Sequence, residues 1–140
     1  AYVRCRAVGT GFNRAGMVMR MNYSDMKNIL LMISDPVEKL DMVMDFGAHM
    51  PDVPESAQCT EIIGCASFAE ICRDGNRFYG RADSALVRGI VAIITAMVDG
   101  KSADEIKKMD LWGEFSALGL NLGTGRMGGV NSMIRFLQNL

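Results

Sequence analysis

The stretch FAEICRDGNRFYGRADSALVRGIVAIITAMVDG, residues 68–100, decides the fold class of this 140-residue chain. Its first half reads as two strands joined at Asp74-Gly75, a dipeptide that strongly favours a hairpin turn. Its second half follows a helix-capping residue at Asp83 or Ser84 and is apolar on nearly every side, which predicts a buried helix. The stretch therefore indicates an α+β fold, in which helices pack around a small antiparallel sheet.

Capping signals on either side of this stretch predict further helices. Ser24 is expected to cap a short first helix, and Asp35 a second one with Pro36 at its first position. Ser102 and Glu105 form a capping box that opens another short helix. The remaining expected elements are a loop over 51–58, strands over 68–73 and 77–82, a helix over 111–120, a glycine-rich loop at GTGRMGG (123–129) and a C-terminal helix.

Composition and charge place the chain among ordinary globular domains, with 49% hydrophobic and 22% charged residues and a net charge of −1. Residues 1–20 hold four arginines and no acid, so we expect a leader or disordered tail there and a single domain over 21–140. The rest of the chain carries 11 basic against 16 acidic side chains. This balance argues against nucleic acid as the main partner, because phosphate binding needs a clustered basic face.

The environment of the protein can also be predicted from its sequence. No segment reaches the roughly 18 uninterrupted apolar residues of a membrane span, so we expect no membrane partner. We expect a cytoplasmic protein, with an organelle as the alternative if residues 1–20 are a transit remnant. In such a reducing compartment the four cysteines are expected to be free thiols rather than a disulfide framework.

Three of the four cysteines gather in CTEIIGCASFAEIC, residues 59–72. Cys65 follows a glycine and precedes two small residues, which leaves space around its sulfur and makes it the best candidate for thiol chemistry. The alternative interpretation is a small buried hydrophobic residue. Cysteine spacings of six and seven and a lone histidine, His49, argue against zinc and against a Cys-His hydrolase. GTGRMGG lacks the lysine of a phosphate loop.

Four segments in order resemble the SufE family of sulfur acceptors, including its CsdE branch, over about residues 21–140. FGAHMPDVPE (46–55) is similar to the family's helix end, and IIGCAS (62–67) to its Gly-Cys-x-Ser segment. FYGRADSALVRGIVAIITAMVDGKSADEI (78–106) resembles its strand, Asp-Ser and buried-helix block. GRMGGVNSMI (125–134) resembles the segment before its last helix. The turn before Arg126 is about two residues shorter than the family's, and Phe68 directly follows Ser67.

The resemblance implies a SufE/IscU-like fold and a carrier of sulfane sulfur rather than an enzyme. A SufS/CsdA-type cysteine desulfurase would pass persulfide sulfur to Cys65, and an iron–sulfur scaffold protein would receive it. Pyridoxal phosphate then belongs to the desulfurase, and no cofactor is expected on this chain. The chain is expected to be a monomer or a homodimer. Arg126 aligns with the family's arginine, and either holds the thiolate or persulfide charge or braces the loop before the last helix.

Two other classes of function remain as alternatives. An iron–sulfur or metal scaffold of related fold would need several ligands that converge on one point. A thiol redox-sensing interaction protein would only have Cys65 oxidised, and Cys59 could then resolve the oxidised Cys65 as a disulfide.

Overall fold

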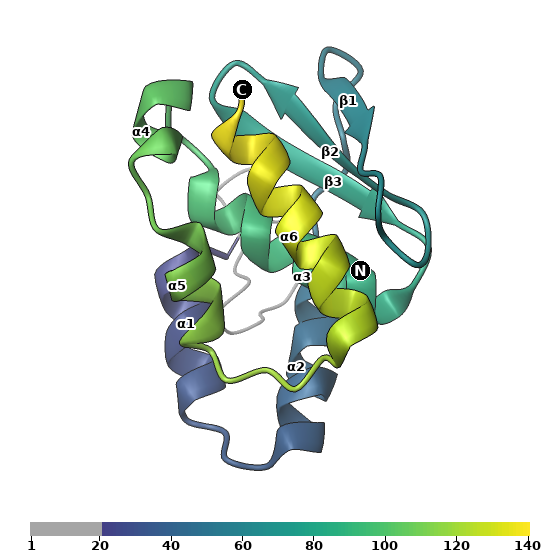
Figure 1. The fold of residues 1–140 in the computed structure, drawn as a ribbon, viewed down its shortest axis with the longest axis vertical. Coiled ribbons are helices and arrows are strands. Elements are labelled where there is room, and N and C mark those ends of the chain that lie inside the picture. The colour runs from purple at the N-terminus through teal and green to yellow at the C-terminus, as the bar shows by residue number, and fades with distance from the viewer. Residues whose placement is uncertain (1–20) are drawn as a thin grey trace, which may run out of the picture.

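The computed structural model describes residues 21–140, and its architecture is α+β as predicted (Figure 1). The expected leader over residues 1–20 lies outside the described residues, and the domain boundary stays a prediction. The elements, in chain order, are α1 (Tyr23–Leu31), α2 (Pro36–Ala48), β1 (Gln58–Glu61), β2 (Ala69–Asp74), β3 (Arg77–Ala82), α3 (Ala85–Val98), α4 (Ala103–Lys107), α5 (Leu111–Ser116) and α6 (Thr124–Gln138).

The sheet is an antiparallel meander in the order β1-β2-β3. The predicted hairpin is confirmed: β2 ends at Asp74, Gly75 has a φ of 62°, and β3 begins at Arg77. Glycine adopts this left-handed conformation without the steric cost that a side chain would bring. In the register of the hairpin Glu70 lies opposite Arg81, and the two side chains form an ion pair.

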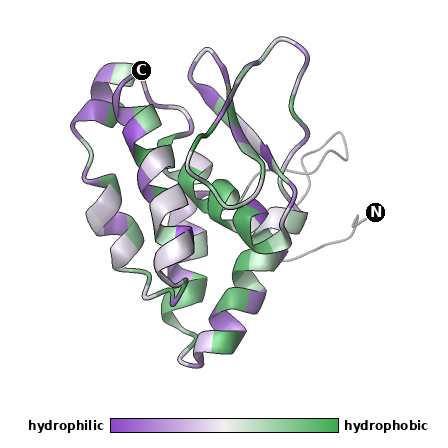
Figure 2. Cartoon of the chain, turned by 45° about the vertical axis from the view of Figure 1, so that its right-hand side comes forward, coloured by the Kyte–Doolittle hydropathy of each residue, from purple (hydrophilic) through white to green (hydrophobic). Residues whose placement is uncertain are grey.

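The helix α3 forms the centre of the core, as its apolar sequence predicts. Ser84 caps it by accepting a hydrogen bond from the Val87 backbone N–H, and eleven of its residues are buried. In Figure 2 it is the most continuously apolar helix, with the sheet and the other helices around it. Gly89 lets α2 approach closely, because a Cβ there would clash with the Val43 backbone. The sheet and the helix α6 are therefore positioned on one shared core.

Local capping is predicted well at two of the helices and wrongly at another. Asp35 caps α2 with Pro36 in its first turn, as expected. Ser102 and Glu105 form the expected capping box at the start of α4. The first helix is capped by Asn22 and not by Ser24. Both residue types accept a hydrogen bond from a backbone N–H two or three positions on, so the choice depends on where the chain enters the helix.

The glycine-rich segment before the last helix differs from the prediction. The sequence predicts a loop over 123–129, whereas α6 begins at Thr124 after Gly123, whose φ is 81°. Three glycines therefore lie inside the helix, where each costs about 1 kcal/mol relative to alanine. One of them, Gly129, is buried and allows a close contact described below. Among residues 21–140, no helix has the length and apolar character needed to cross a membrane.

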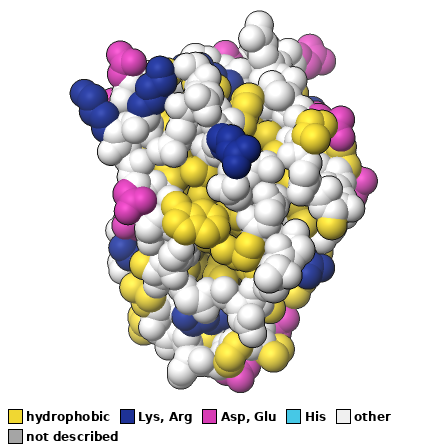
Figure 3. Space-filling view, viewed as in Figure 1, with side chains coloured by type: hydrophobic (Ala, Val, Ile, Leu, Met, Phe, Trp, Pro, Cys, Tyr) yellow, Lys and Arg dark blue, Asp and Glu magenta, His cyan; other side chains and the backbone are white. Residues whose placement is uncertain are grey.

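The described surface exposes a few large apolar side chains. On the face seen in Figure 3, apolar side chains gather along the seam between α5 and α6, with scattered charged groups around them. The large apolar residues exposed over residues 21–140 are Leu31, Met32, Val37, Ile63, Phe68 and Trp112. Two of these, Ile63 and Phe68, belong to the loop between β1 and β2, so this loop exposes apolar side chains to solvent.

Candidate functional site

Cys65 lies in the loop between β1 and β2, residues 62–68, as the Gly-Cys step predicts. The loop is closed at its base by a hydrogen bond from the Ile62 backbone N–H to the Ala69 carbonyl, at 2.8 Å. Its far end is tied to the end of β3, where the Asp83 N–H donates to the Phe68 carbonyl at 3.2 Å. We call residues 62–68 the acceptor loop, after the role that the sequence resemblance predicts for Cys65. Its two ends are held by the sheet, and its tip carries the thiol.

The tip of the acceptor loop packs against α6 through two glycines. Gly64 has a φ of 102°, and a Cβ there would lie 2.7 Å from Ser132 Oγ. Gly129 faces the thiol, because a Cβ added to it would lie 3.0 Å from Cys65 Sγ. Both contacts are too close for a side chain to fit without movement. The two glycines therefore allow the loop backbone and the sulfur to sit directly on the surface of α6.

The thiol borders a small cavity of about 20 Å³. A cavity of this size has room for about one water-sized atom. Apolar side chains from α3 and α6 form most of its wall. The residues that line it are Cys65, Ala66, Val87, Ile90, Gly125, Arg126, Gly129, Val130 and Met133. The thiol is thus half-buried beside an apolar space large enough for one more atom.

Burial controls the protonation of the thiol. It raises the pKa of Cys65 above its ordinary value, because a thiolate loses solvation in apolar surroundings. Among the described residues, no charged group contributes a compensating effect. In the observed conformation burial therefore favours the neutral thiol over the nucleophilic thiolate.

Arg126 lies in the first turn of α6 and lines the same cavity as Cys65. The structure therefore brings the two predicted site residues together. Arg126 itself is exposed. The raised pKa of Cys65 is caused by burial and not by the charge of Arg126. Both proposed roles, holding charge and bracing the loop, stay predictions.

Ser67 is a further residue of the acceptor loop with unusual surroundings. Its hydroxyl oxygen is buried and has no hydrogen-bond partner within residues 21–140. A buried hydroxyl without a partner costs about 1–3 kcal/mol. This cost falls on the loop conformation that the structure shows.

The expectation of free cysteines is wrong for two of the three described cysteines. Cys59 and Cys72 form a disulfide, and Cys65 is the free thiol of residues 21–140. The pairing arises because the β1–β2 register puts Cys59 directly opposite Cys72. Cys59 therefore lies in a strand and is bonded elsewhere, so in this state it cannot resolve an oxidised Cys65.

The possible metal ligands of the described residues do not gather at Cys65. Cys59, Glu70 and Cys72 form a group whose ligand atoms lie within 4.8 Å of one another. Two of these three ligand atoms are bonded to each other as a disulfide. Metal binding there would require its reduction, because a metal is held by thiolates. A metal scaffold centred on Cys65 would lack the converging ligands that it needs.

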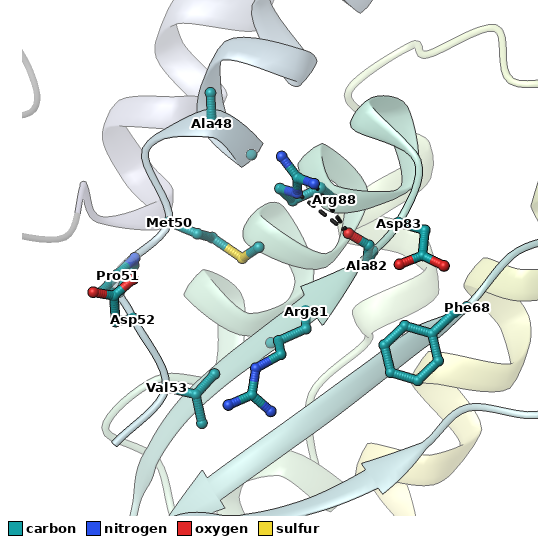
Figure 4. Close-up of a pocket in the computed structure, with 12 residues that line it drawn as sticks. Ala48, Met50, Pro51, Asp52, Val53, Phe68, Arg81, Ala82, Asp83 and Arg88 are labelled. Carbon is teal, nitrogen blue, oxygen red and sulfur yellow. Dashed lines mark hydrogen bonds between the residues drawn. The ribbon is translucent and has the colours of Figure 1, made fainter. Parts of the chain in front are cut away.

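A wider groove borders the acceptor loop (Figure 4). Its volume is about 400 Å³, and it runs between the end of α2 and β3. Phe68 lies at one margin, where the acceptor loop ends. Arg88 forms part of the groove and is held in place by donating two hydrogen bonds to the Ala82 carbonyl, at 3.2 and 3.3 Å. The groove is therefore a concave surface next to the loop.

Several features of this site were not predicted from the sequence. The contacts of Gly129 with Cys65 and of Gly64 with Ser132 join segments more than sixty residues apart. The glycines are visible in the sequence, but their local pattern indicates only a loop and a turn. A glycine at a buried helix position, which normally costs stability, was the signal that could have identified the contact.

The fold and site define a class of protein: a small α+β domain with one partly buried free thiol, among its described residues, at the tip of a loop. The family described as SufE, an Fe-S metabolism associated domain, matches residues 25–140. The chain therefore belongs to the SufE family, which confirms the resemblance in its sequence.

Individual relatives agree with this assignment. A SufE-like protein of Rhizobium meliloti (strain 1021) is 33% identical over 109 residues, covering 69% of this chain and 78% of that protein. The sulfur acceptor protein CsdE of Escherichia coli (strain K12) is 26% identical over 117 residues, covering 77% and 80%. The solution structure of a hypothetical protein from Thermus thermophilus superposes with a TM-score of 0.68 at 14% identity, covering 84% of this chain and 90% of that one. This last likeness supports the fold alone.

Proposed function

We propose that this chain is a sulfur acceptor that takes persulfide sulfur from a cysteine desulfurase onto Cys65 and passes it on to iron–sulfur cluster assembly. The observation that carries the proposal is the seating of Cys65 beside an apolar cavity of about 20 Å³. A terminal persulfide sulfur is one atom larger than a thiol, and this cavity offers space for one atom. Membership of the SufE family and similarity to a protein named as a sulfur acceptor support the same role.

The transfer step follows from the chemistry of thiolates. Cys65 loses its proton to water and attacks the terminal sulfur of the desulfurase persulfide. The S–S bond of the desulfurase breaks, a new S–S bond forms on Cys65, and the desulfurase cysteine leaves as a thiolate. Electrons balance without an external oxidant or reductant. The pyridoxal phosphate that generates the sulfur belongs to the desulfurase, and this chain carries no cofactor of its own.

The closed conformation suits storage, and an open one suits transfer. In the closed state the raised pKa of Cys65 keeps the thiol unreactive, and the cavity wall shields a persulfide from other thiols and oxidants. The unpaired hydroxyl of Ser67 favours opening of the acceptor loop. We propose that docking of the desulfurase on exposed Ile63 and Phe68 releases the loop. Arg126 would then hold the charge of the thiolate or persulfide at the mouth of the cavity.

Mass spectrometry tests the proposal directly. The chain is incubated with a pyridoxal-phosphate cysteine desulfurase and cysteine, and the intact mass is measured for wild type and Cys65→Ser. We expect an addition of about 32 Da, one sulfur atom, that reductant removes and that Cys65→Ser lacks. Arg126→Gln should still fold but should accumulate the adduct more slowly. An adduct that persists in Cys65→Ser would contradict the proposal. Stimulation of the desulfurase that survives Cys65→Ser would instead favour a non-carrier interaction protein.

A further inference from the structure

The Cys59–Cys72 disulfide lies at the base of the acceptor loop, on the strands that carry it. It joins β1 to β2 directly across their pairing, so it closes a ring that contains every residue of the acceptor loop. Strand β1 pairs with β2 alone, at the edge of the sheet. All four of its side chains are exposed, so burial of apolar groups does little to hold it there. The disulfide is therefore a principal constraint on strand β1, which holds the N-terminal end of the acceptor loop.

We propose that Cys59–Cys72 is a redox-active site whose substrate is a dithiol reductant, and that its reduction frees the acceptor loop and exposes Cys65. With the disulfide intact, opening is confined to the acceptor loop between its two anchored ends. With the disulfide reduced, β1 can separate from β2. The open state of the loop then gains the conformational freedom of β1 in addition to that of the acceptor loop. This inference concerns regulation of the site in the proposed function, and it rests on that function only for its biological purpose.

Exposure decides which sulfur a reductant attacks. Cys59 is exposed, whereas Cys72 is completely buried. Arg81 Nη1 lies 3.8 Å from Cys59 Sγ, but it is ion-paired with Glu70, so exposure rather than charge directs the attack to Cys59. Glu70 Oε2 lies 3.8 Å from Cys72 Sγ and disfavours a negative charge on that sulfur. Because Cys72 is the leaving group, Glu70 slows its release. A dithiol should still reduce the bond more readily than a monothiol, because its second thiol attacks the mixed disulfide on Cys59 within the same molecule.

The exchange balances in two steps. A thiolate of the reductant attacks Cys59 Sγ and forms a mixed disulfide, while the Cys59–Cys72 bond breaks and Cys72 takes a proton from water. The second thiolate of the reductant then attacks the reductant's own sulfur in the mixed disulfide. Cys59 leaves as a thiolate, and the reductant departs as a disulfide with two electrons fewer. The reverse sequence with an oxidised dithiol restores the bond.

The test measures access to Cys65 without any desulfurase. The chain is prepared oxidised, prepared reduced with dithiothreitol and desalted without oxygen, and prepared as Cys59→Ser. Each sample is treated with iodoacetamide, and the alkylation of Cys65 over time is followed by peptide mass spectrometry. We expect Cys65 to react roughly 5-fold faster or more in the reduced and Cys59→Ser samples than in the oxidised one. Dithiothreitol should have no effect on Cys59→Ser, and thermal unfolding shows whether that variant is folded.

Two results would overturn the inference. One is an equal rate of Cys65 alkylation in the oxidised and reduced wild type, which uses the native chain and does not depend on any variant folding. The other is recovery of Cys59 and Cys72 as free thiols after treatment with an oxidised dithiol. Failure of the proposed function looks different: alkylation would respond to reduction, but a desulfurase would leave no sulfur on Cys65 in either state.

Discussion

Gly129→Ala should release Cys65 from α6, and Gly128→Ala provides a matched control. The two glycines are neighbours inside the same helix. A Cβ at Gly129 would lie 3.0 Å from Cys65 Sγ and 3.5 Å from its Cα, whereas a Cβ at Gly128 meets nothing within 4 Å. Carbon and sulfur normally approach to about 3.5–4 Å, so the first substitution pushes the acceptor loop outward by several tenths of an ångström. The second leaves the loop untouched.

The expected magnitudes follow from two opposing effects. Alanine in place of glycine stabilises a helix interior by about 1 kcal/mol, and both variants gain this. Overpacking of a close contact costs about 1–3 kcal/mol, and only Gly129→Ala bears it. Gly128→Ala should therefore raise the free energy of unfolding by about 1 kcal/mol, which is roughly 4 °C in Tm for a domain of this size. Gly129→Ala should lie about 1–3 kcal/mol below it.

The loop can give way more easily than the core, so most of the penalty should appear as loop opening. A bias of 1–3 kcal/mol changes a two-state equilibrium about 5- to 150-fold. Alkylation of Cys65 by iodoacetamide, followed by peptide mass spectrometry, should accelerate within that range in Gly129→Ala and not in Gly128→Ala. Equal alkylation rates in the two variants, with equal gains in Tm, would refute the argument that Gly129 seats the thiol.

Three further predictions concern the same loop. Ser67→Ala removes a buried hydroxyl without a partner, so we expect about 1 kcal/mol more stability and slower alkylation of Cys65; a loss of stability in thermal unfolding would contradict this. The pH profile of Cys65 alkylation should have its midpoint above the ordinary thiol pKa, since burial favours the neutral form. The folded chain then keeps this proton to higher pH than the unfolded one, so the free energy of unfolding falls between the ordinary and the raised pKa, and Cys65→Ala should lack that fall. Ile63→Ser should weaken desulfurase stimulation without changing Tm, because Ile63 is 79% exposed; unchanged stimulation would exclude Ile63 as a docking contact.

Much of the architecture could be predicted because its causes lie within a few residues along the chain. The Asp74-Gly75 step leads to a turn with Gly75 at positive φ, and Ser102 reaches its partner Glu105 three positions on. The continuous apolar character of α3 predicts burial whatever its neighbours are. Where the same local rules allow two answers, as with the N-cap at Asn22 or Ser24, the prediction failed.

The sequence by itself determined the fold class, the element order and the presence of one thiol at a glycine-flanked turn. It did so because hydrophobic periodicity, capping and turn chemistry act locally. Only the tertiary structure decided that Cys59 pairs with Cys72, that Cys65 rests on Gly129 and that Arg126 shares its cavity. These relations depend on strand register and on the packing of α6 against the loop. Spacing along the chain does not report register or packing, because both arise from contacts between distant segments.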